Sequence, residues 1–368
     1  MEKELRVIIS GGGTGGHIFP AVSIANAIKA LRPDAKILFV GALGRMEMQR
    51  VPAAGYEIKG LPVRGLFRPL WKPANIGVAI DYLRSKWIAR KILKDFKPNV
   101  AVGVGGYASS ATLAAAHALG IPCLVQEQNS YAGIANKRMA GKAQRFCVAY
   151  EGMERFFPAE KILLTGNPVR QALLDTSVTR EDAIKSFGLN PSKKTILMVG
   201  GSIGAQTIND SVLKHLDLVE STDTQIILQT GSRFSAVVAK QLNGLEFPNL
   251  KVTDFISDMG AAYKAADLVI SRAGAGSISE FCLLGKPVIL VPSPNVTEDH
   301  QTKNTFALST KGAAIYVKDA EAPATLLELA IKTVNDDAKL KSLSENVLKL
   351  ALPDSAEIIA KEVIKLAQ

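Results

Sequence analysis

The sequence predicts an α/β protein built from two doubly wound parallel-sheet domains. Its length of 368 residues suits two domains of ordinary size. Short β-branched runs alternate with longer amphipathic segments, which is typical of parallel sheets with helical crossovers. That alternation starts afresh in the second half, and both halves open alike, with an apolar strand and a glycine loop in RVIISGGGTGG and in TILMVGGSIGA. We therefore expect two similar domains that face a cleft.

Strands are expected at the apolar runs in chain order, namely 6–10, 36–41, 99–105, 122–127, 195–201, 224–231, 250–256, 267–274 and 287–293. Residues 100–126 carry no formal charge and are long enough to span a bilayer. However, their glycines and serines cluster at 103–110, and Pro122 interrupts them. This pattern favours a buried strand, a glycine turn, an alanine-rich helix and another strand over a membrane span.

The domain boundary is expected near 165–170, where Gly166, Asn167 and Pro168 interrupt regular structure. The first domain would then cover residues 1–165 and the second residues 166–352. The segment after Pro353 has helical periodicity, and from its pattern it can pack against either domain.

Composition and charge narrow the class of protein. The chain is 47% hydrophobic and 21% charged, which is typical of a globular protein rather than a disordered one. Its first residues lack the apolar core of a secretory signal, so we expect a cytoplasmic location. Cys123, Cys147 and Cys282 stand singly without CxxC spacing, which predicts buried thiols rather than disulfides or zinc ligands. The net charge of +10 indicates an anionic partner, either nucleic acid, anionic lipid or a phosphorylated substrate.

Glycine-rich loops follow several expected strands. The loop at 11–17, GGGTGGH, satisfies the GxGxxG dinucleotide fingerprint, but the second strand ends without the expected ribose-binding carboxylate. Arg45 could serve a phosphorylated ribose, so an NADP enzyme stays open. Such a loop either packs a strand against a helix or lets backbone amides approach an anion beside a helix N-terminus. Further glycine loops at 103–109, 200–205 and 272–280 favour a diphosphate site.

Several side chains near these loops are candidates for chemistry. His17 brings a group that titrates near neutral pH, so it is either a general base or a loop buttress. Ser277 and Glu280 match a helix capping box, but Glu280 could instead accept hydrogen bonds from ribose hydroxyls while amides of 275–277 bind phosphate. The polar segment 298–304 is either a solvated helix start or a sugar-binding segment that uses Asp299, His300, Gln301 and Asn304.

The sequence has no DxD triplet, so a carboxylate pair for a divalent ion on a nucleotide diphosphate has no obvious candidate. Backbone amides and helix dipoles would then meet the charge of a leaving diphosphate. A GxSxG elbow and a P-loop lysine motif are also missing, which weighs against hydrolases and kinases.

Two basic segments, 65–72 and 82–97, also carry large apolar side chains. They resemble an interfacial membrane surface, although a cationic helix with its apolar side in the core is the ordinary explanation. Nucleic-acid binding has no recognition motif to support it. The candidate membrane residues are Leu66, Phe67, Trp71, Arg84, Lys86, Trp87, Arg90 and Lys91.

Taken together, the motifs resemble the MurG family, the peptidoglycan N-acetylglucosaminyltransferases that make lipid II on the cytoplasmic face of the bacterial membrane. The matching motifs, in order, are GGTGGHIFPAVSIA, RMEMQRVPAAGY, GVGGYAS, QEQN, GNPVR, GGSIGA, RAGAGSISE and EDHQTKN. The resemblance implies the glycosyltransferase-B fold with two Rossmann-like domains. It also implies that UDP-N-acetylglucosamine binds mainly to the C-terminal domain and the lipid-linked acceptor to the N-terminal domain. The last helix, about 353–368, would pack with the N-terminal domain.

The resemblance assigns roles to residues within these motifs. The implied donor-binding residues are Thr14, Gly15, Gly16, Asn129, Arg170, Ser202, Ile256, Ala275, Gly276, Ser277, Ile278, Ser279, Glu280 and Gln301. Gly105, Gly106 and Tyr107 would meet the acceptor or its diphosphate. His17 would be the catalytic base, with Glu127 as the alternative. The chain departs from the family at Ile203, where Gln is frequent, and at Gln126, where some members have His.

The reaction implied is attack by the C4 hydroxyl of N-acetylmuramic acid in lipid I on C1 of the donor sugar, with inversion and release of UDP. No metal cofactor is expected. The implied partners are an anionic membrane surface and other cell-wall synthesis proteins, not nucleic acid, and the implied location is peripheral, on the cytoplasmic face of the plasma membrane. Rival hypotheses are a UDP-N-acetylglucosamine 2-epimerase of the same architecture, an NADP-dependent oxidoreductase, and a basic module that binds nucleic acid or membrane.

Overall fold

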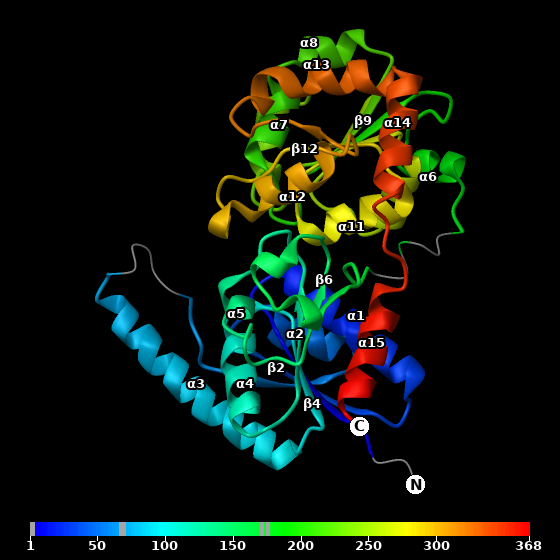
Figure 1. Cartoon of the computed structure of the whole chain (residues 1–368). Coiled ribbons are helices and arrows are strands. Elements are labelled where there is room, and N and C mark those ends of the chain that lie inside the picture. The colour runs from blue at the N-terminus through cyan, green and yellow to red at the C-terminus, as the bar shows by residue number, and fades with distance from the viewer. Residues whose placement is uncertain (1–3, 66–70, 170–172, 174–176) are drawn as a thin grey trace. The chain divides into compact units, whose positions relative to one another are not determined.

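The computed structural model describes residues 4–65, 71–169, 173 and 177–368 (Figure 1). The chain divides into two compact units. The N-terminal unit comprises Met1–Val169 and Leu352–Gln368, and the C-terminal unit comprises Arg170–Ala351. The boundaries expected from sequence were 165/166 and 352/353. Each unit contains its own parallel sheet, so the predicted pair of doubly wound α/β domains is confirmed.

The described part of the N-terminal unit contains a seven-stranded parallel sheet in the order β3-β2-β1-β4-β5-β6-β7. Its strands are β1 (Arg6–Ser10), β2 (Lys36–Ala42), β3 (Glu57–Leu61), β4 (Val100–Gly103), β5 (Cys123–Glu127), β6 (Arg145–Val148) and β7 (Ile162–Leu164). Ile8 of β1 pairs with Leu38 on one side and Ala101 on the other, so the strand order reverses between β1 and β4. The sequence prediction missed β3, β6 and β7.

Helices cover both faces of this sheet. They are α1 (Gly15–Leu31), α2 (Glu47–Ala53), α3 (Ala74–Phe96), α4 (Gly106–Ala118), α5 (Ile134–Lys137) and α15 (Ser355–Leu366). The C-terminal helix α15 lies beside α1, and its Ile359 and Val363 share a core with Ile24 (Figure 1). On the other face, α3 and α4 contribute Leu93 and Leu113.

The uncharged segment 100–126 forms β4, α4 and β5, as predicted. This segment therefore belongs to the core of the N-terminal unit, where its valines and most of its alanines are buried. Within the described residues, no helix combines the length and the apolarity that crossing a bilayer requires.

The described part of the C-terminal unit contains a six-stranded parallel sheet in the order β10-β9-β8-β11-β12-β13. Its strands are β8 (Thr195–Val199), β9 (Gln225–Gln229), β10 (Leu250–Thr253), β11 (Leu268–Ser271), β12 (Val288–Leu290) and β13 (Ile315–Tyr316). The order reverses between β8 and β11, which pair directly, Ile196 with Leu268 and Met198 with Ile270. The short strand β13 was not predicted.

The helices of the C-terminal unit are α6 (Arg180–Ser186), α7 (Gln206–Leu213), α8 (Leu216–Ser221), α9 (Ser235–Leu242), α10 (Met259–Ala265), α11 (Ala275–Leu284), α12 (His300–Ser309), α13 (Ala322–Val334) and α14 (Asp337–Leu348). Leu326 and Leu327 of α13 pack with Ile208 of α7 against Ile196 and Ile270 of the sheet. This core holds β8 and β11, the two strands at the reversal.

Cys123 and Cys147 lie in strands and Cys282 lies in α11, and all three are buried and outside any disulfide. Burial raises the pKa of each thiol to about 12, because the thiolate would lose its hydration. The prediction of buried thiols is confirmed.

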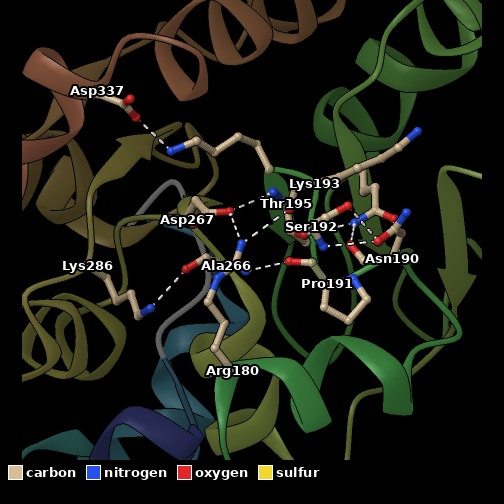
Figure 2. Close-up of polar contacts among 12 residues, drawn as sticks. Arg180, Asn190, Pro191, Ser192, Lys193, Thr195, Ala266, Asp267, Lys286 and Asp337 are labelled. Atoms are coloured by element: carbon tan, nitrogen blue, oxygen red, sulfur yellow. Dashed lines mark hydrogen bonds and ion pairs between the residues drawn. The ribbon is translucent and has the colours of Figure 1, made fainter.

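A polar network fixes the amino ends of β8 and β11 (Figure 2). Asp267 accepts hydrogen bonds from the Thr195 amide and from the Arg180 guanidinium, each at 2.8 Å. Nearby, Lys286 donates to the carbonyl of Ala266 at 2.9 Å, and burial lowers the pKa of Lys286 to about 8. This end of the sheet is therefore occupied by structural contacts, whereas the glycine loops lie at the opposite end.

Replacing Asp267 by Asn is expected to lower the free energy of unfolding by about 1–3 kcal/mol, because the charge-assisted bond to Arg180 and the bond to the Thr195 amide both weaken. Urea unfolding measures this loss. Asp223→Asn is the matched control, because the Asp223 side chain is 93% exposed and its pairing with Lys193 should contribute little. Equal losses in the two variants would contradict the assignment.

Candidate functional site

Two glycine loops lie at the carboxyl end of each sheet. In the N-terminal unit, the loops at 11–14 and 104–105 follow β1 and β4, and in the C-terminal unit those at 200–205 and 272–274 follow β8 and β11. Each pair flanks the point where the strand order reverses. Open α/β sheets bind their ligands at this point, because the loops diverge there.

The two N-terminal loops pack backbone against backbone. A Cβ atom at Gly106 would lie 2.6 Å from the carbonyl oxygen of Gly12, and one at Gly105 would lie 2.8 Å from Nε2 of His17. Both glycines also have positive φ values, 96° and 86° for Gly105 and Gly106. Glycine at these positions therefore lets the start of α4, with Tyr107 half exposed, lie next to the GGGTGGH loop.

The His17 ring is held in one orientation by the loop that precedes it. Its Nδ1 lies 2.9 Å from the carbonyl oxygen of Gly12 and 3.4 Å from the hydroxyl of Thr14. Because a carbonyl only accepts, Nδ1 carries the proton, and the lone pair of the neutral ring is on Nε2. The nitrogen that faces Gly105 is thus the one that can accept a proton, so His17 can buttress the loop and act as a base.

Thr14, Gly15 and Gly16 begin helix α1. Thr14 is the N-cap residue but makes no side-chain capping bond, and its carbonyl accepts from the amides of His17 and Ile18. Thr14 and Gly16 are exposed. The start of this 17-residue helix is therefore accessible and attracts anions.

Glu127 ends strand β5 and is 1% exposed. Its Oε1 accepts from the backbone amide of Asn129 at 3.0 Å and from the side-chain amide of Asn129 at 3.3 Å. Its Oε2 accepts from the Gly133 amide at 2.9 Å and from the Asn136 side chain at 2.8 Å. A carboxylate engaged in this way organises the loop that presents Asn129. The arrangement favours a positioning role for Glu127 over the alternative role of base.

A buried amide network joins the QEQN and GNPVR motifs. Gln126 donates to Asn167 at 3.0 Å, Asn167 donates to the carbonyl of Gln128 at 3.0 Å, and Gln128 donates to the carbonyl of Val104 at 2.8 Å. These side chains thereby fix the segment that follows β4. Gln126, a departure from the family, is thus a buried structural position.

The GGSIGA loop of the C-terminal unit is exposed and held through its backbone. The Gly204 amide donates to the carbonyl of Gly201 at 2.9 Å, and the Ser202 carbonyl accepts from the Ser232 amide at 3.2 Å. The Ile203 side chain is 62% exposed. The shape of this loop therefore does not depend on the side chain at position 203, where the family often has Gln.

Helix α11 begins at Ala275 after an N-cap at Gly274 that has no side chain to cap with. The capping-box interpretation of Ser277 and Glu280 is therefore wrong, because Ser277 lies inside the first turn. Glu280 instead accepts a hydrogen bond from the hydroxyl of Tyr263 at 2.8 Å and is half-buried.

The first turn of α11 presents backbone amides to its surroundings. Gly276 and Ser277 belong to this turn, whose N–H groups find no carbonyl within the helix. Ile278 is buried, and the hydroxyl of Ser279 donates back to the carbonyl of Ala275 at 3.1 Å. The backbone rather than the serine side chains is therefore the chemically useful part of this turn.

Arg272, which precedes this turn, is a residue that sequence reasoning missed. Its guanidinium donates to the carbonyl of Val291 at 3.0 Å and to the hydroxyl of Thr207 at 3.1 Å, and it forms an ion pair with Asp319. These bonds tie the end of β11 to β12 and α7. The only signal in the sequence was an arginine directly after a buried strand.

The segment 298–304 forms a short 3-10 helix, Thr297–Asp299, and the start of α12. Gln301 accepts from the Ser293 amide at 2.8 Å and is half-buried. Asn304 is fully buried and donates to the carbonyl of Ala273 at 3.3 Å, which favours a structural role over the sugar-binding alternative. Ile256, after β10, is 6% exposed.

Helix α3 carries apolar side chains on two sides. Val78, Ala89 and Leu93 are buried, whereas Trp87 is 68% exposed. Sequence reasoning missed other exposed apolar residues of this helix, namely Ile76, Ile80 and Leu83. Of the expected membrane residues, Trp71, Arg84, Arg90 and Lys91 are exposed and Lys86 is half-buried. Leu66 and Phe67, like the candidate donor residue Arg170, lie outside the described residues.

Sequence reasoning also missed Glu47, the first residue of α2. It is 1% exposed and accepts from the Gly13 amide in the GGGTGGH loop at 3.0 Å. Glu47 lies five residues after the end of β2 and is not part of the dinucleotide fingerprint, so the fingerprint did not identify it. Among the described residues, no group of three or more His, Cys, Asp or Glu side chains could hold a metal ion.

Comparisons with known proteins agree with this architecture. The Glycosyltransferase family 28 N-terminal domain matches residues 7–148, and the family's C-terminal domain matches residues 195–359. A relative from Bacteroides fragilis is 67% identical over 99% of this chain and 96% of its own length, and one from Bacteroides thetaiotaomicron is 66% identical over 100% and 99%. Both are named UDP-N-acetylglucosamine--N-acetylmuramyl-(pentapeptide) pyrophosphoryl-undecaprenol N-acetylglucosamine transferase.

Among solved structures, Acinetobacter baumannii MurG is similar with a TM-score of 0.76 and 27% identity, over 98% of this chain and 99% of that one. A UDP-GlcNAc 2-epimerase from Neisseria meningitidis has a TM-score of 0.68 at 14% identity, over 99% of this chain and 100% of that one, which is a likeness of fold alone. The predicted glycosyltransferase-B fold class is confirmed. The chain therefore belongs to glycosyltransferase family 28 and, within it, to the MurG family.

Proposed function

We propose that this chain transfers N-acetylglucosamine from UDP-N-acetylglucosamine to the C4 hydroxyl of N-acetylmuramic acid in undecaprenyl-diphosphate-linked lipid I. The product is lipid II, the precursor for peptidoglycan synthesis, cell-wall growth and cell division. The observation that carries the proposal is 66–67% identity, over nearly the whole chain, to relatives named for this transfer. The 2-epimerase alternative is not favoured, because its likeness is limited to 14% identity.

The C-terminal unit binds the donor in this proposal. The amides of Gly276 and Ser277 and the exposed loop at 200–205 flank the strand-order reversal, and together they suit a diphosphate. Glu280 lies one turn further along α11, where it accepts hydrogen bonds from the ribose hydroxyls. The Tyr263 hydroxyl, 2.8 Å from the Glu280 carboxylate, holds it in place.

The N-terminal unit binds the acceptor and supplies the base. Nε2 of His17 takes the proton of the C4 hydroxyl as the oxygen attacks C1 of the donor sugar. The C1 bond to the UDP oxygen breaks in the same displacement, so the configuration inverts from α to β. Gly105 lies beside His17, and Gly105, Gly106 and Tyr107 contact the acceptor or its diphosphate.

The leaving UDP is stabilised by backbone amides and helix N-termini, to which Thr14–Gly16 also contribute. Preorganised amides meet the growing charge on the diphosphate without rearrangement. The proposed reaction therefore requires no divalent metal ion.

Helix α3 docks the protein on an anionic membrane surface. Ile76, Ile80, Leu83 and Trp87 follow one another at spacings of four, three and four residues, which places them on one helix face. All four are at least 60% exposed. The exposed basic residues Arg84, Arg90 and Lys91 flank this apolar stripe, as is typical of interfacial helices. The enzyme then acts as a peripheral protein on the cytoplasmic face of the plasma membrane, where its lipid-linked acceptor lies.

The transfer is tested by incubating the chain with UDP-N-acetylglucosamine and a lipid I analogue in the presence of EDTA. We expect a lipid II analogue and UDP in equal amounts. His17→Ala should lower kcat by about 10²–10⁴-fold, because the general base is lost. His117→Ala, at an exposed position on α4, is the control. A 2-epimerised sugar as the main product would contradict the transferase, and near-normal turnover of His17→Ala with both substrates saturating would contradict the base.

Glu280→Gln is expected to raise KM for UDP-N-acetylglucosamine by about ten- to hundredfold, because charge-assisted hydrogen bonds to ribose are weakened by about 1.5–3 kcal/mol. Tyr263→Phe should raise it less, since the carboxylate remains. Titration calorimetry with UDP checks both variants. Glu328→Gln, an exposed position on α13, provides the control. Unchanged UDP affinity in Glu280→Gln would remove Glu280 from the donor site.

Replacing Arg84, Lys86, Arg90 and Lys91 together by Gln should weaken binding to phosphatidylglycerol vesicles at least about tenfold, because each basic residue near an anionic surface contributes about 1 kcal/mol. Cosedimentation at low and high salt measures this. The matched control removes four exposed charges from the C-terminal unit, those of Lys240, Lys251, Lys332 and Lys339. Equal vesicle binding by the two variants would show that the membrane-binding surface lies elsewhere on the protein.

A further inference from the structure

Glu47 is a buried carboxylate built into the N-terminal unit. It is 1% exposed, and its oxygens accept from the Ala42 amide and the Gly13 amide, each at 3.0 Å. A Cβ atom at Gly12 would lie 2.1 Å from Oε1 of Glu47, and one at Gly41 would lie 2.6 Å from its Cγ. Two glycines therefore make the space that this side chain fills.

The peptide group between Gly12 and Gly13 connects Glu47 to His17. Its N–H donates to Glu47 at 3.0 Å, and its carbonyl oxygen accepts from Nδ1 of His17 at 2.9 Å. Both atoms belong to one planar, conjugated amide. A negative charge at the N–H end therefore polarises the carbonyl, which becomes a better acceptor for the imidazole proton.

We propose that Glu47 is a positioning residue that acts on His17 through this peptide group. The carboxylate holds the imidazole with its proton on Nδ1 and its lone pair on Nε2, the nitrogen that faces Gly105. A carboxylate bonded directly to a catalytic histidine sets the tautomer in the same way in Ser-His-Asp enzymes. The effect on turnover rests on the proposed function, in which His17 is the base.

A carboxylate suits this position better than an amide. The two donors come from different segments, the end of β2 and the glycine loop, and each bonds to its own oxygen. A glutamine has only one oxygen, so its NH₂ group would face one of the two N–H groups. The negative charge also favours the imidazolium that forms when His17 takes the acceptor proton.

The first test measures the His17 tautomer in the full chain, which has four histidines. Nitrogen NMR of protein labelled with ¹⁵N-histidine distinguishes the Nδ1–H and Nε2–H forms of the neutral ring, and the His17→Ala spectrum assigns the signals. We expect the Nδ1–H form in the unmodified chain and a larger Nε2–H fraction in Glu47→Gln, because the neutral amide polarises the Gly12 carbonyl less. An unchanged tautomer in Glu47→Gln would overturn the proposal.

The second test is a double-mutant cycle of lipid II synthesis. Glu47→Gln should lower kcat about ten- to hundredfold, the range found for residues that orient a metal-bound histidine. Its KM for UDP-N-acetylglucosamine should stay within about twofold, because Glu47 acts on the proposed base and not on the bound donor. In the His17→Ala background the same substitution should change kcat less than about twofold. Equal losses in both backgrounds would indicate a structural role and overturn the proposal.

Two controls keep the outcome interpretable. Glu362→Gln changes a carboxylate of the same unit, which pairs with Arg145 at 3.0 Å, and it should leave the tautomer and kcat unchanged. Glu47→Asp keeps the charge on a shorter side chain, so it should keep more of the Nδ1–H form than Glu47→Gln. If thermal unfolding shows that Glu47→Gln has a folding defect, Glu47→Asp is used in its place. If the unmodified chain makes no lipid II, the proposed function fails, whereas the tautomer measurement still decides the role of Glu47.

Discussion

The close approach of the loops after β1 and β4 governs the N-terminal site. Adjacent parallel strands bring these loops within contact, but only residues without a Cβ allow this approach: Gly106 lies against the backbone of Gly12, and Gly105 lies against the ring of His17. The orientation of His17, the start of α4 and the polar network around Gln128 all follow from this contact. A single side-chain atom at the interface would displace all three.

The C-terminal unit reaches a comparable arrangement by other means. Its strand order reverses in the same way, and its first glycine loop is also folded tightly after the leading strand. Here, however, the side chains of Arg272 and Asp319 hold the start of the loop after β11, so this loop is fixed by side chains rather than by backbone contact. The two units therefore share a fold and the placement of their glycine loops, but they differ in how each keeps its loops rigid.

The fold class was predictable because its main signals are local. Apolar runs followed by glycine loops identified the strands at both reversal points, including β1, β4, β8 and β11. The strands that escaped prediction, such as β3 and β13, are short or carry polar residues, and only pairing with a neighbour makes them strands.

The candidate site was predictable only in part. His17 and the start of α11 follow recognisable loops, but the partners of Glu47 and Glu280 come from segments that are distant in sequence. Ser277 and Glu280 match the sequence pattern of a capping box, and the same pattern occurs here with Glu280 bonded to a tyrosine. The difference depends on where Tyr263 lies in three dimensions, which one sequence does not reveal.

The position of α15 has a consequence for synthesis on the ribosome. Ile359, Ala360 and Val363 complete the core around α1, the helix that carries His17, yet they lie in α15, which follows the C-terminal unit in the sequence. A nascent chain therefore leaves one side of α1 exposed until α15 has been synthesised, although the sheet strands beside α1 were made long before. The N-terminal unit is thus completed only after the C-terminal unit has been synthesised, and a chain that stops before α15 lacks a finished N-terminal core.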